Sequence, residues 1–375
     1  MAAPKLAHRP ICRRPAAMPP AHLFSMLHNT KSPEPRMEPE MKYRRDILKT
    51  ALLATAALAT AMWSAGAMAA DKVKVGVFPV SSALPYFVAA ERGYFKEQGI
   101  DAEMVKLMGA PPIVQGMLTN DLDAGANLVT VDGMNGNTKK EGLLYYMSLY
   151  GQNKFAQMEQ FVAKNGIDAK SVKDLKGTAK KIMSAPGAGN MAMARAVLGA
   201  VGMKEGTDYT LTELAMNLHA DAMKAGTFDA GYTLEPNATV MNKSGAANTV
   251  EAGVVSKYII GREEAYAYMA GGAITGKMLR ERPDVARRFT AAWRKALKDI
   301  EQDPTTRELL KGNTFTPPEL AMTIPLPRMM MVDQLSAQDK KDFQKVIDFT
   351  IESGVIKDKI DTSKYLVSPD RKAAS

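Results

Sequence analysis

The sequence predicts an α/β protein of two lobes, each lobe a mainly parallel sheet flanked by helices. The first observation is that residues 73–103 read as a strand, a helix and a second strand. Such a unit places its two strands parallel in one sheet, joined by a right-handed crossover. The second observation is length, because residues 71–375 are more than one small core needs and suit two lobes.

The opening unit places a loop where such sheets bind ligands. Valines alternate with other residues over 73–77, a pattern typical of a half-buried strand. Ser81 and Ser82 follow, and both are good caps for a helix that begins near Ala83. The loop over 79–85 then lies at the carboxyl end of the first strand, where open α/β sheets bind their ligands.

A family resemblance is carried by residues 89–103, which read Ala-Ala-Glu-Arg-Gly-Tyr-Phe-Lys-Glu-Gln-Gly-Ile-Asp-Ala-Glu. This segment resembles the start of the nitrate/sulfonate/taurine-type periplasmic solute-binding proteins, relatives of the binders of the pyrimidine precursor of thiamine. The resemblance covers roughly Val73 to Gly354. It implies a two-lobed periplasmic-binding-protein fold with two crossover segments and a small-molecule ligand between the lobes. It also implies an ABC permease and a separate ATPase subunit as partners.

The first seventy residues read as a leader. Residues 1–40 are rich in Pro, Ala, Arg and Met, and we expect a disordered upstream extension with Met41 as the true start. Residues 41–70 have a basic start, a short apolar run and small residues before Asp71, which predicts a signal peptide cleaved near Ala69/Ala70. Arg44 and Arg45 resemble a twin-arginine export signal, although an ordinary signal with two chance arginines is the alternative.

Composition argues against several classes of function. The chain has a net charge of +9, but its first seventy residues contribute +6, so residues 71–375 carry only +3. They show no basic tract, so we expect no nucleic-acid binding. The single cysteine, Cys12, lies in the leader, and His219 is the sole histidine of residues 71–375. We expect no metal site, no cofactor and no catalytic residue, and we expect His219 at the surface or at a helix cap. The predicted signal peptide, together with the lack of a cysteine for a lipid anchor at the cleavage site, predicts a soluble, periplasmic monomer.

The rest of the chain divides between the two expected lobes. We assign residues 71–155 with 268–375 to the first lobe and residues 156–267 to the second. Residues 143–150 read as one strand. Two stretches have apolar residues at helical spacing, and these predict helices over 283–303 and 336–353. The first of them carries Trp293 on its apolar face, so this tryptophan is expected in the core.

Polar and glycine-rich loops at predicted strand ends supply the candidate ligand contacts. Asn127, Thr130 and Asp132 follow a short buried strand, although simple helix capping explains each of them equally well. Tyr86 and Tyr232 could stack on a planar ligand. The cleft loops contain no arginine, which favours an organic ligand with one acidic group, or a pyrimidine. The full candidate set is Ser81, Ser82, Tyr86, Gly109, Asn127, Thr130, Asp132, Gly187, Gly189, Asn190, Tyr232 and Glu235.

One motif leaves alternatives open. Residues 187–192 read Gly-Ala-Gly-Asn-Met-Ala after a predicted strand and at the start of a helix. Free N–H groups at a helix start bind a small anion, but this pattern also matches a dinucleotide fingerprint. The alternative function is therefore a periplasmic nicotinamide-dependent oxidoreductase, with Glu205, Asp208 or Glu213 as the acidic partner. A pyrimidine-synthesising enzyme of the same fold would need a cysteine-rich motif, and a sensor subunit without a transporter would look identical in sequence.

Overall fold

A computed structural model describes residues 69–371 of the chain. The predicted upstream extension over 1–40, with Cys12, and the predicted signal peptide up to residue 68 lie outside the described residues. Among residues 69–371, no helix combines the length and the apolar character that crossing a membrane requires.

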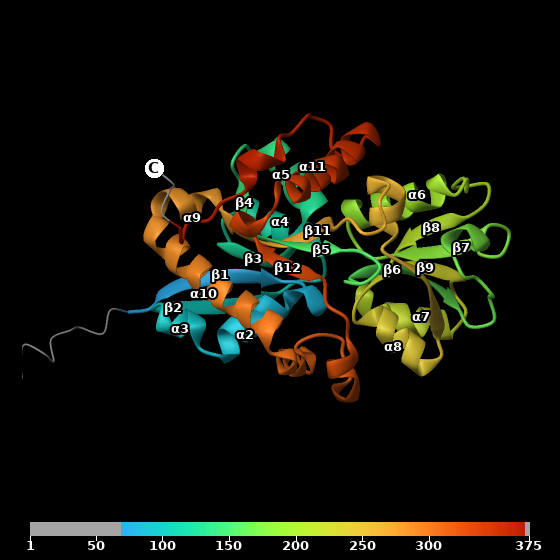
Figure 1. Cartoon of the computed structure of the whole chain (residues 1–375), viewed down its shortest axis with the longest axis horizontal. Coiled ribbons are helices and arrows are strands. Elements are labelled where there is room, and N and C mark those ends of the chain that lie inside the picture. Colours follow the sequence, from blue (N-terminus) through green and yellow to red (C-terminus); the bar gives the residue numbers. More distant parts are fainter. Residues whose placement is uncertain (1–68, 372–375) are drawn as a thin grey trace, which may run out of the picture. The chain divides into compact units, whose positions relative to one another are not determined.

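The first lobe is the part of the chain built on a seven-stranded sheet (Figure 1). Its strand order is β12-β5-β11-β3-β1-β2, and β4 pairs with β11 beside this path. The opening prediction is confirmed, because β1 pairs parallel with β2 from Asp71 opposite Ile100 to Val77 opposite Lys106. The strands are β1 (Asp71–Val77), β2 (Ile100–Lys106), β3 (Ala124–Val129), β4 (Leu144–Tyr146), β5 (Ser148–Gln152), β11 (Ala267–Thr275) and β12 (Arg328–Met331).

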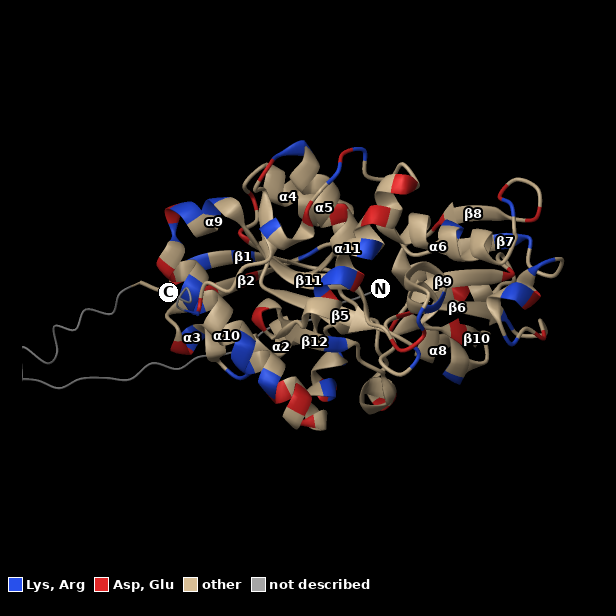
Figure 2. Ribbon diagram, turned by 45° about the horizontal axis from the view of Figure 1, so that its top comes forward, with Lys and Arg blue, Asp and Glu red and all other residues tan. Residues whose placement is uncertain are grey.

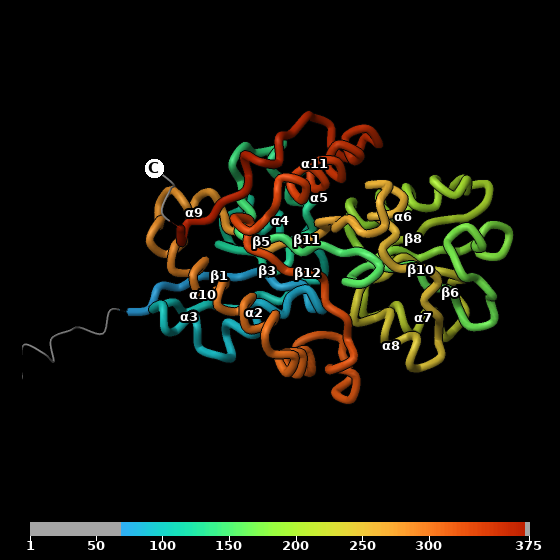
Figure 3. The backbone as a smooth tube through the Cα atoms, in the orientation of Figure 1, coloured from blue at the N-terminus to red at the C-terminus, as the bar shows by residue number. Residues whose placement is uncertain are grey.

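The second lobe is built on a five-stranded sheet with the order β10-β6-β9-β7-β8. Its strands are β6 (Glu159–Lys164), β7 (Lys181–Ser184), β8 (Thr210–Glu213), β9 (Ala230–Leu234) and β10 (Ala247–Ala252). The chain passes between the two sheets over residues 153–158 and again over residues 253–266 (Figure 3). The two expected crossover segments are therefore present.

Both sheets are mixed, which corrects the expectation that they are mainly parallel. In the first lobe, β11 runs antiparallel to β3, β4 and β5, and β12 runs antiparallel to β5. In the second lobe, β6 runs antiparallel to both β9 and β10. Each of these antiparallel pairs includes β5, β6, β10 or β11, the four strands that adjoin a crossover segment. Such a strand is not joined to its neighbour by a helical crossover, so nothing requires it to run parallel.

Helices cover both faces of each sheet. In the first lobe α4, α5 and α11 lie on one side, and α2, α3 and α10 lie on the other (Figure 1). In the second lobe α6 lies on one side, with α7 and α8 on the other (Figure 1). The helices are α2 (Leu84–Glu91), α3 (Tyr94–Glu97), α4 (Ala110–Leu118), α5 (Thr130–Lys139), α6 (Ala188–Ala200), α7 (His219–Lys224), α8 (Asn237–Ser244), α9 (Gly276–Glu281), α10 (Pro283–Gln302) and α11 (Ala337–Glu352).

Helix α10 confirms the helix predicted over 283–303, and Trp293 is fully buried on it. The Trp293 ring lies 5.7 Å from the ring of Phe289, which in turn lies 5.0 Å from Phe95 of α3. Stacked rings at these separations add to the stabilisation from burial alone. The tryptophan is therefore a core residue, as the apolar spacing of the helix predicted.

The stretch over 143–150 forms two strands instead of the single one predicted. Met147 separates β4 from β5, and both strands pair with β11. The pairing of β11 with β5 is irregular near Tyr268 and Ala270, and its pairing with β3 is irregular near Gly271. An irregularity of this kind bends a strand and interrupts its ladder. This break depends on the partner strand, so the local sequence did not reveal it.

Charged residues of both signs are interspersed over the helices (Figure 2). Several pairs link α10 to the opening unit: Arg288 lies 2.5 Å from Asp71, and Arg92 lies 2.6 Å from Asp299. Exposed pairs of this kind are typically worth about 0–1 kcal/mol each. The burial of α10 therefore contributes more to this face of the lobe than its ion pairs do.

Candidate functional site

The candidate site lies where strand ends of the two sheets meet. Ser81 follows β1 in the first lobe, and Glu235 follows β9 in the second. The backbone N–H of Ser81 donates a 3.0 Å hydrogen bond to the carbonyl oxygen of Glu235. Open α/β sheets bind ligands beyond the carboxyl ends of their strands, so this contact lies where a ligand is expected.

A second contact between the lobes joins the starts of two helices. Asp132, in the first turn of α5, accepts a 3.3 Å hydrogen bond from the backbone N–H of Gly189 in the first turn of α6. A Cβ at Gly189 would lie 2.8 Å from Asp132 Oδ2, so only glycine admits the carboxylate this closely. Burial raises the pKa of Asp132 to about 6, although the N–H of Gly189 opposes this shift.

Backbone approach around this contact also depends on Gly187 and Gly109. Gly187 immediately precedes α6 with a φ of 104°, which favours glycine, and a Cβ there would lie 3.5 Å from Asp132 Oδ1. Gly109 precedes α4, and a Cβ there would lie 3.3 Å from Cγ of Pro186. The loops before α4 and α6 are thus in contact, which brings two of the predicted glycines to the same place.

Asn127, in β3, forms hydrogen bonds with the loop that follows β1 in the first lobe. Its side-chain amide donates to Ser82 Oγ at 3.0 Å and to the carbonyl oxygen of Phe78 at 2.9 Å. Its Oδ1 accepts from the N–H of Phe78 at 3.1 Å. Thr130 donates to the carbonyl oxygen of Tyr268 at 2.9 Å. The hydrogen bonds of both residues therefore stay within the first lobe, where Asn127 fixes the loop that carries Ser81 and Ser82 and Thr130 ties the start of α5 to β11.

Two buried polar atoms at the meeting edges have no partner among residues 69–371. They are Ser81 Oγ and Asn190 Oδ1, and both residues are fully buried. Asn190 Nδ2 donates to the carbonyl oxygen of Pro186 at 2.7 Å, which keeps its amide group beside the start of α6. A buried polar atom without a partner costs free energy, and such atoms call for an explanation in a ligand or a water.

A buried polar cluster lies beside the first crossover, and the sequence patterns did not predict it. Glu159 accepts hydrogen bonds from Gln152 Nε2 at 2.5 Å and from the hydroxyl of Tyr232. Gln160 donates to the side chain of Glu235. Burial raises the pKa of Glu159 and that of Glu235 to about 7. The available signal was a pair of polar residues, Glu159 and Gln160, directly before the apolar run of a strand.

The two tyrosines that were predicted to stack on a planar ligand, Tyr86 and Tyr232, lie away from the meeting edges. Tyr86 packs in the first-lobe core, with its ring 5.8 Å from Phe95, and its hydroxyl donates to the carbonyl oxygen of Ala102 at 2.9 Å. Tyr232 is fully buried, with its ring 5.4 Å from Phe161. Each hydroxyl has a buried acceptor, so burial of the whole ring is possible. The structure does not bring either ring to the meeting edges.

The prediction that His219 lies at the surface is wrong, whereas its predicted alternative, a place at a helix end, agrees with its position directly after a short 3-10 helix and at the start of α7. His219 is fully buried, with Nδ1 2.8 Å from Thr233 Oγ1 and Nε2 3.0 Å from the carbonyl oxygen of Leu214. Burial lowers the pKa of His219 to about 4, so the ring is neutral at neutral pH. Both ring nitrogens have hydrogen-bond partners, so His219 has a structural role and ties the start of α7 to β9.

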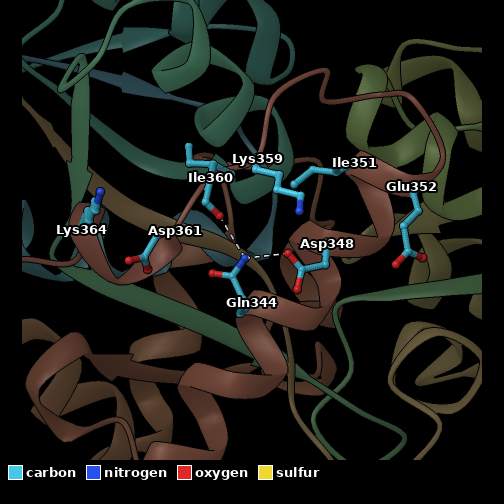
Figure 4. Close-up of a pocket in the computed structure, with 8 residues that line it drawn as sticks. All are labelled: Gln344, Asp348, Ile351, Glu352, Lys359, Ile360, Asp361 and Lys364. Carbon is cyan, nitrogen blue, oxygen red and sulfur yellow. Dashed lines mark hydrogen bonds between the residues drawn. The ribbon is translucent and has the colours of Figure 1, made fainter.

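Other places in the described chain are weaker candidates. Within residues 69–371, no group of three His, Cys, Asp or Glu is placed to hold a metal ion. A surface hollow of about 750 Å³ lies along α11 and the segment after it (Figure 4). There Gln344 Nε2 donates to Asp348 at 2.8 Å and to the carbonyl oxygen of Ile360 at 3.0 Å. Its Oε1 accepts from Thr362. This glutamine is fully paired, so the hollow lacks the unpartnered groups of the meeting edges.

Known proteins resemble this chain over most of its length, both in sequence family and in fold. Residues 66–311 match the model of the NMT1-like family. No curated protein is significantly similar to the chain.

Three solved structures illustrate the likeness of fold. The alkanesulfonate-binding protein SsuA of Xanthomonas axonopodis pv. citri, bound to MOPS, is 16% identical with a TM-score of 0.63, over 79% of this chain and 98% of its own. The periplasmic nitrate-binding protein NrtA of Synechocystis PCC 6803 is 15% identical with a TM-score of 0.63, over 78% and 84%. The desulfurization enzyme DSZB is 14% identical with a TM-score of 0.58, over 79% and 96%. The periplasmic-binding-protein fold is thus confirmed, and it includes an enzyme as well as binding proteins.

Proposed function

Because the chain belongs to the NMT1-like family, we propose that it is the substrate-binding component of an ABC-type importer. It captures a small solute between the two lobes and delivers it to a membrane permease with a separate ATPase subunit. The observation that carries this proposal is the meeting of strand ends from both sheets, at Ser81 with Glu235 and at Asp132 with Gly189. Relatives of the same fold include sulfonate-binding and nitrate-binding proteins.

The mechanism is closure of the lobes around the ligand. We assign residues 71–155 with 268–375 to one moving body and residues 156–267 to the other, so that motion occurs in the two crossover segments. Closure excludes water and strengthens the few polar contacts that remain. The permease then distinguishes the closed form from the open form by a difference in affinity. As a monomer exported by a twin-arginine-type signal, the protein would act in the periplasm.

The proposed ligand belongs to one of two classes. One is a small organic anion such as a sulfonate or an aromatic carboxylate, which would use free N–H groups at the start of α6. The other is a pyrimidine, which would use uncharged hydrogen-bonding groups. The contacts that we propose for this ligand are Ser81, Ser82, Gly109, Asp132, Gly187, Gly189, Asn190 and Glu235, and the hydrogen bonds and close approaches around them support the proposal.

A thermal-shift screen tests the binding function. The purified protein would be heated with ethanesulfonate, nitrate, benzoate, 4-aminopyrimidine or NAD(P). A ligand at 100 times its dissociation constant adds about 2.7 kcal/mol of stability, which raises the melting temperature by a few degrees. A shift with one small solute supports the receptor, whereas no shift with any small solute over the full concentration range contradicts it.

A nicotinamide-dependent oxidoreductase is the second candidate, and one observation favours it. Strand β7, helix α6 and strand β8 form a parallel unit, and Glu213 ends β8 where a dinucleotide site has its ribose-binding acid. Against it, the Asp132 carboxylate lies at the N–H of Gly189, where a pyrophosphate would bind. A thermal shift with NAD(P) alone would select this enzyme over the receptor.

A further inference from the structure

We propose that Asp132 is an internal anion at the start of α6, which excludes anionic ligands and selects an uncharged or cationic ligand with N–H or O–H donors. The proposal rests on the proposed function and decides between its two ligand classes. Asp132 comes from the first lobe, whereas α6 belongs to the second. The residue therefore acts on specificity only when the lobes are closed around the site.

The geometry places the carboxylate where an anion would bind. The start of a helix attracts negative charge because its first N–H groups are free and its dipole points there. Helix α6 has 13 residues and no side-chain cap, and the Gly189 N–H instead donates to Asp132 Oδ2 at 3.3 Å. The absent side chains of Gly187 and Gly189 leave the space that the carboxylate occupies. A sulfonate or carboxylate ligand would have to displace Asp132 to reach these N–H groups.

The surrounding charges make a second anion unfavourable. Within residues 69–371, no salt bridge involves Asp132, Glu159 or Glu235, and all three side chains are buried. The charged group that acts most on Asp132 is another carboxylate, that of Glu213. A buried negative charge without a cation is costly, and a further negative charge on the ligand would add repulsion.

The unpartnered atoms indicate which groups the ligand presents. Asn190 Oδ1 can only accept a hydrogen bond, and Ser81 Oγ can accept or donate one. Both are fully buried, and Asn190 lies one residue after Gly189 in the first turn of α6. A ligand N–H or O–H group would satisfy them, whereas a sulfonate or a nitrate brings acceptors alone. The site thus fits an amine or an amino-substituted heterocycle.

Titration calorimetry at pH 7.5 tests the proposal with two probes, ethanesulfonate as the anion and 4-aminopyrimidine as the uncharged donor. Wild type would be compared with Asp132→Asn and Asp132→Ser, two neutral variants of different volume, so that one remains if the other fails to fold. Asp101→Asn is the control, because it removes one negative charge at an exposed position that makes no hydrogen bond to the site. We expect the dissociation constant of ethanesulfonate to be at least about tenfold lower for the Asp132 variants than for wild type or the control.

Each outcome separates the inference from the function on which it rests. Wild type is expected to bind 4-aminopyrimidine more tightly than ethanesulfonate. Equal ethanesulfonate affinity in wild type and in both Asp132 variants overturns the proposal, and so does a failure of every variant to bind the anion. If wild type binds no small solute while the Asp132 variants gain the anion, the receptor function fails and the role of Asp132 stands.

Discussion

Asp132 and Glu159 are both buried acids, but the groups that hold them differ. Asp132 is held across the lobes by a backbone N–H of α6, so its hydrogen bond must break when the lobes separate. Glu159 is held by two side chains: Gln152, which ends β5 of the first lobe at the other end of the short first crossover, and Tyr232, which lies in the same sheet as Glu159. In the proposed receptor, the first acid is therefore tied to lobe closure and ligand choice, whereas we expect the second to act on folding stability.

The two carboxylates differ in whether they can regain contact with water. On lobe opening Asp132 can regain water, so its burial cost opposes closure and a ligand can alter that cost. Glu159 lies beside the segment that joins the lobes, and we expect it to stay buried in both states. Its burial cost is paid whenever the chain folds.

Replacing Glu159 by Gln should raise stability at high pH. The folded-state pKa of Glu159 is raised from its ordinary value to about 7, so its stabilising contribution is full below about pH 4.5 and is lost as the pH rises through about 7. Glutamine keeps an acceptor for Gln152 and Tyr232 and does not ionise. The gain at pH 8 should reach about 3 kcal/mol at most, with none at pH 4.

Urea unfolding of wild type and Glu159→Gln from pH 4 to pH 8 measures this difference. Glu235 titrates in the same direction in both proteins and cancels from the comparison. A difference in unfolding free energy that is the same at pH 4 and pH 8 would contradict the assignment.

Replacing Gly189 by Ala should weaken ligand binding by tenfold to a hundredfold. The added Cβ would lie 2.8 Å from Asp132 Oδ2 and 3.0 Å from Cβ of Val131, and overpacking of this kind costs about 1–3 kcal/mol. Gly199→Ala is the matched control, because it lies in the same helix and its Cβ would meet nothing within 4 Å. Titration with whichever solute shifts the wild type gives the measurement. An equal loss of ligand affinity in both variants would show that the loss comes from a change within α6 and not from the contact between the lobes.

Lowering the pH from 7.5 to 5 should strengthen ethanesulfonate binding to wild type by about tenfold. The pKa of Asp132 is raised to about 6, so the internal anion becomes neutral over this range. The groups that face it are the N–H groups of Ala188 and Gly189, Glu213 and Tyr146. His219 does not interfere, because its pKa is lowered to about 4. Asp132→Asn should show a much smaller pH dependence, and an equal response in both proteins would assign the effect to another group.

Replacing Tyr86 by Phe should have the smallest effect. The change removes only the hydroxyl that donates to the carbonyl oxygen of Ala102, which costs about 1 kcal/mol. Ligand affinity should not change, since the ring packs in the first-lobe core. A clear loss of ligand affinity, measured in the same titration, would instead indicate that Tyr86 contacts the ligand.

Local sequence features predicted the elements well where short-range signals dominate. The alternation over 73–77 and the apolar spacing over 283–303 and 336–353 each act within a few residues, and the structure confirms β1, α10 and α11. The candidate loops could also be predicted, because strand ends in an α/β sheet share an edge. Strand direction at the crossovers could not, since it depends on which distant strand is the neighbour.

Periodic patterns predicted the α/β class, the opening parallel unit and the main helices, because periodicity is a property of neighbouring residues, and one short segment carried the resemblance to the family. Packing in three dimensions placed Asp132 against Gly189, turned Tyr86 and Tyr232 into the cores and buried His219. The hydrogen-bonded partners in these places lie up to 73 positions apart along the chain. Packing brings such residues together, and no local pattern in the sequence encodes the distance between them.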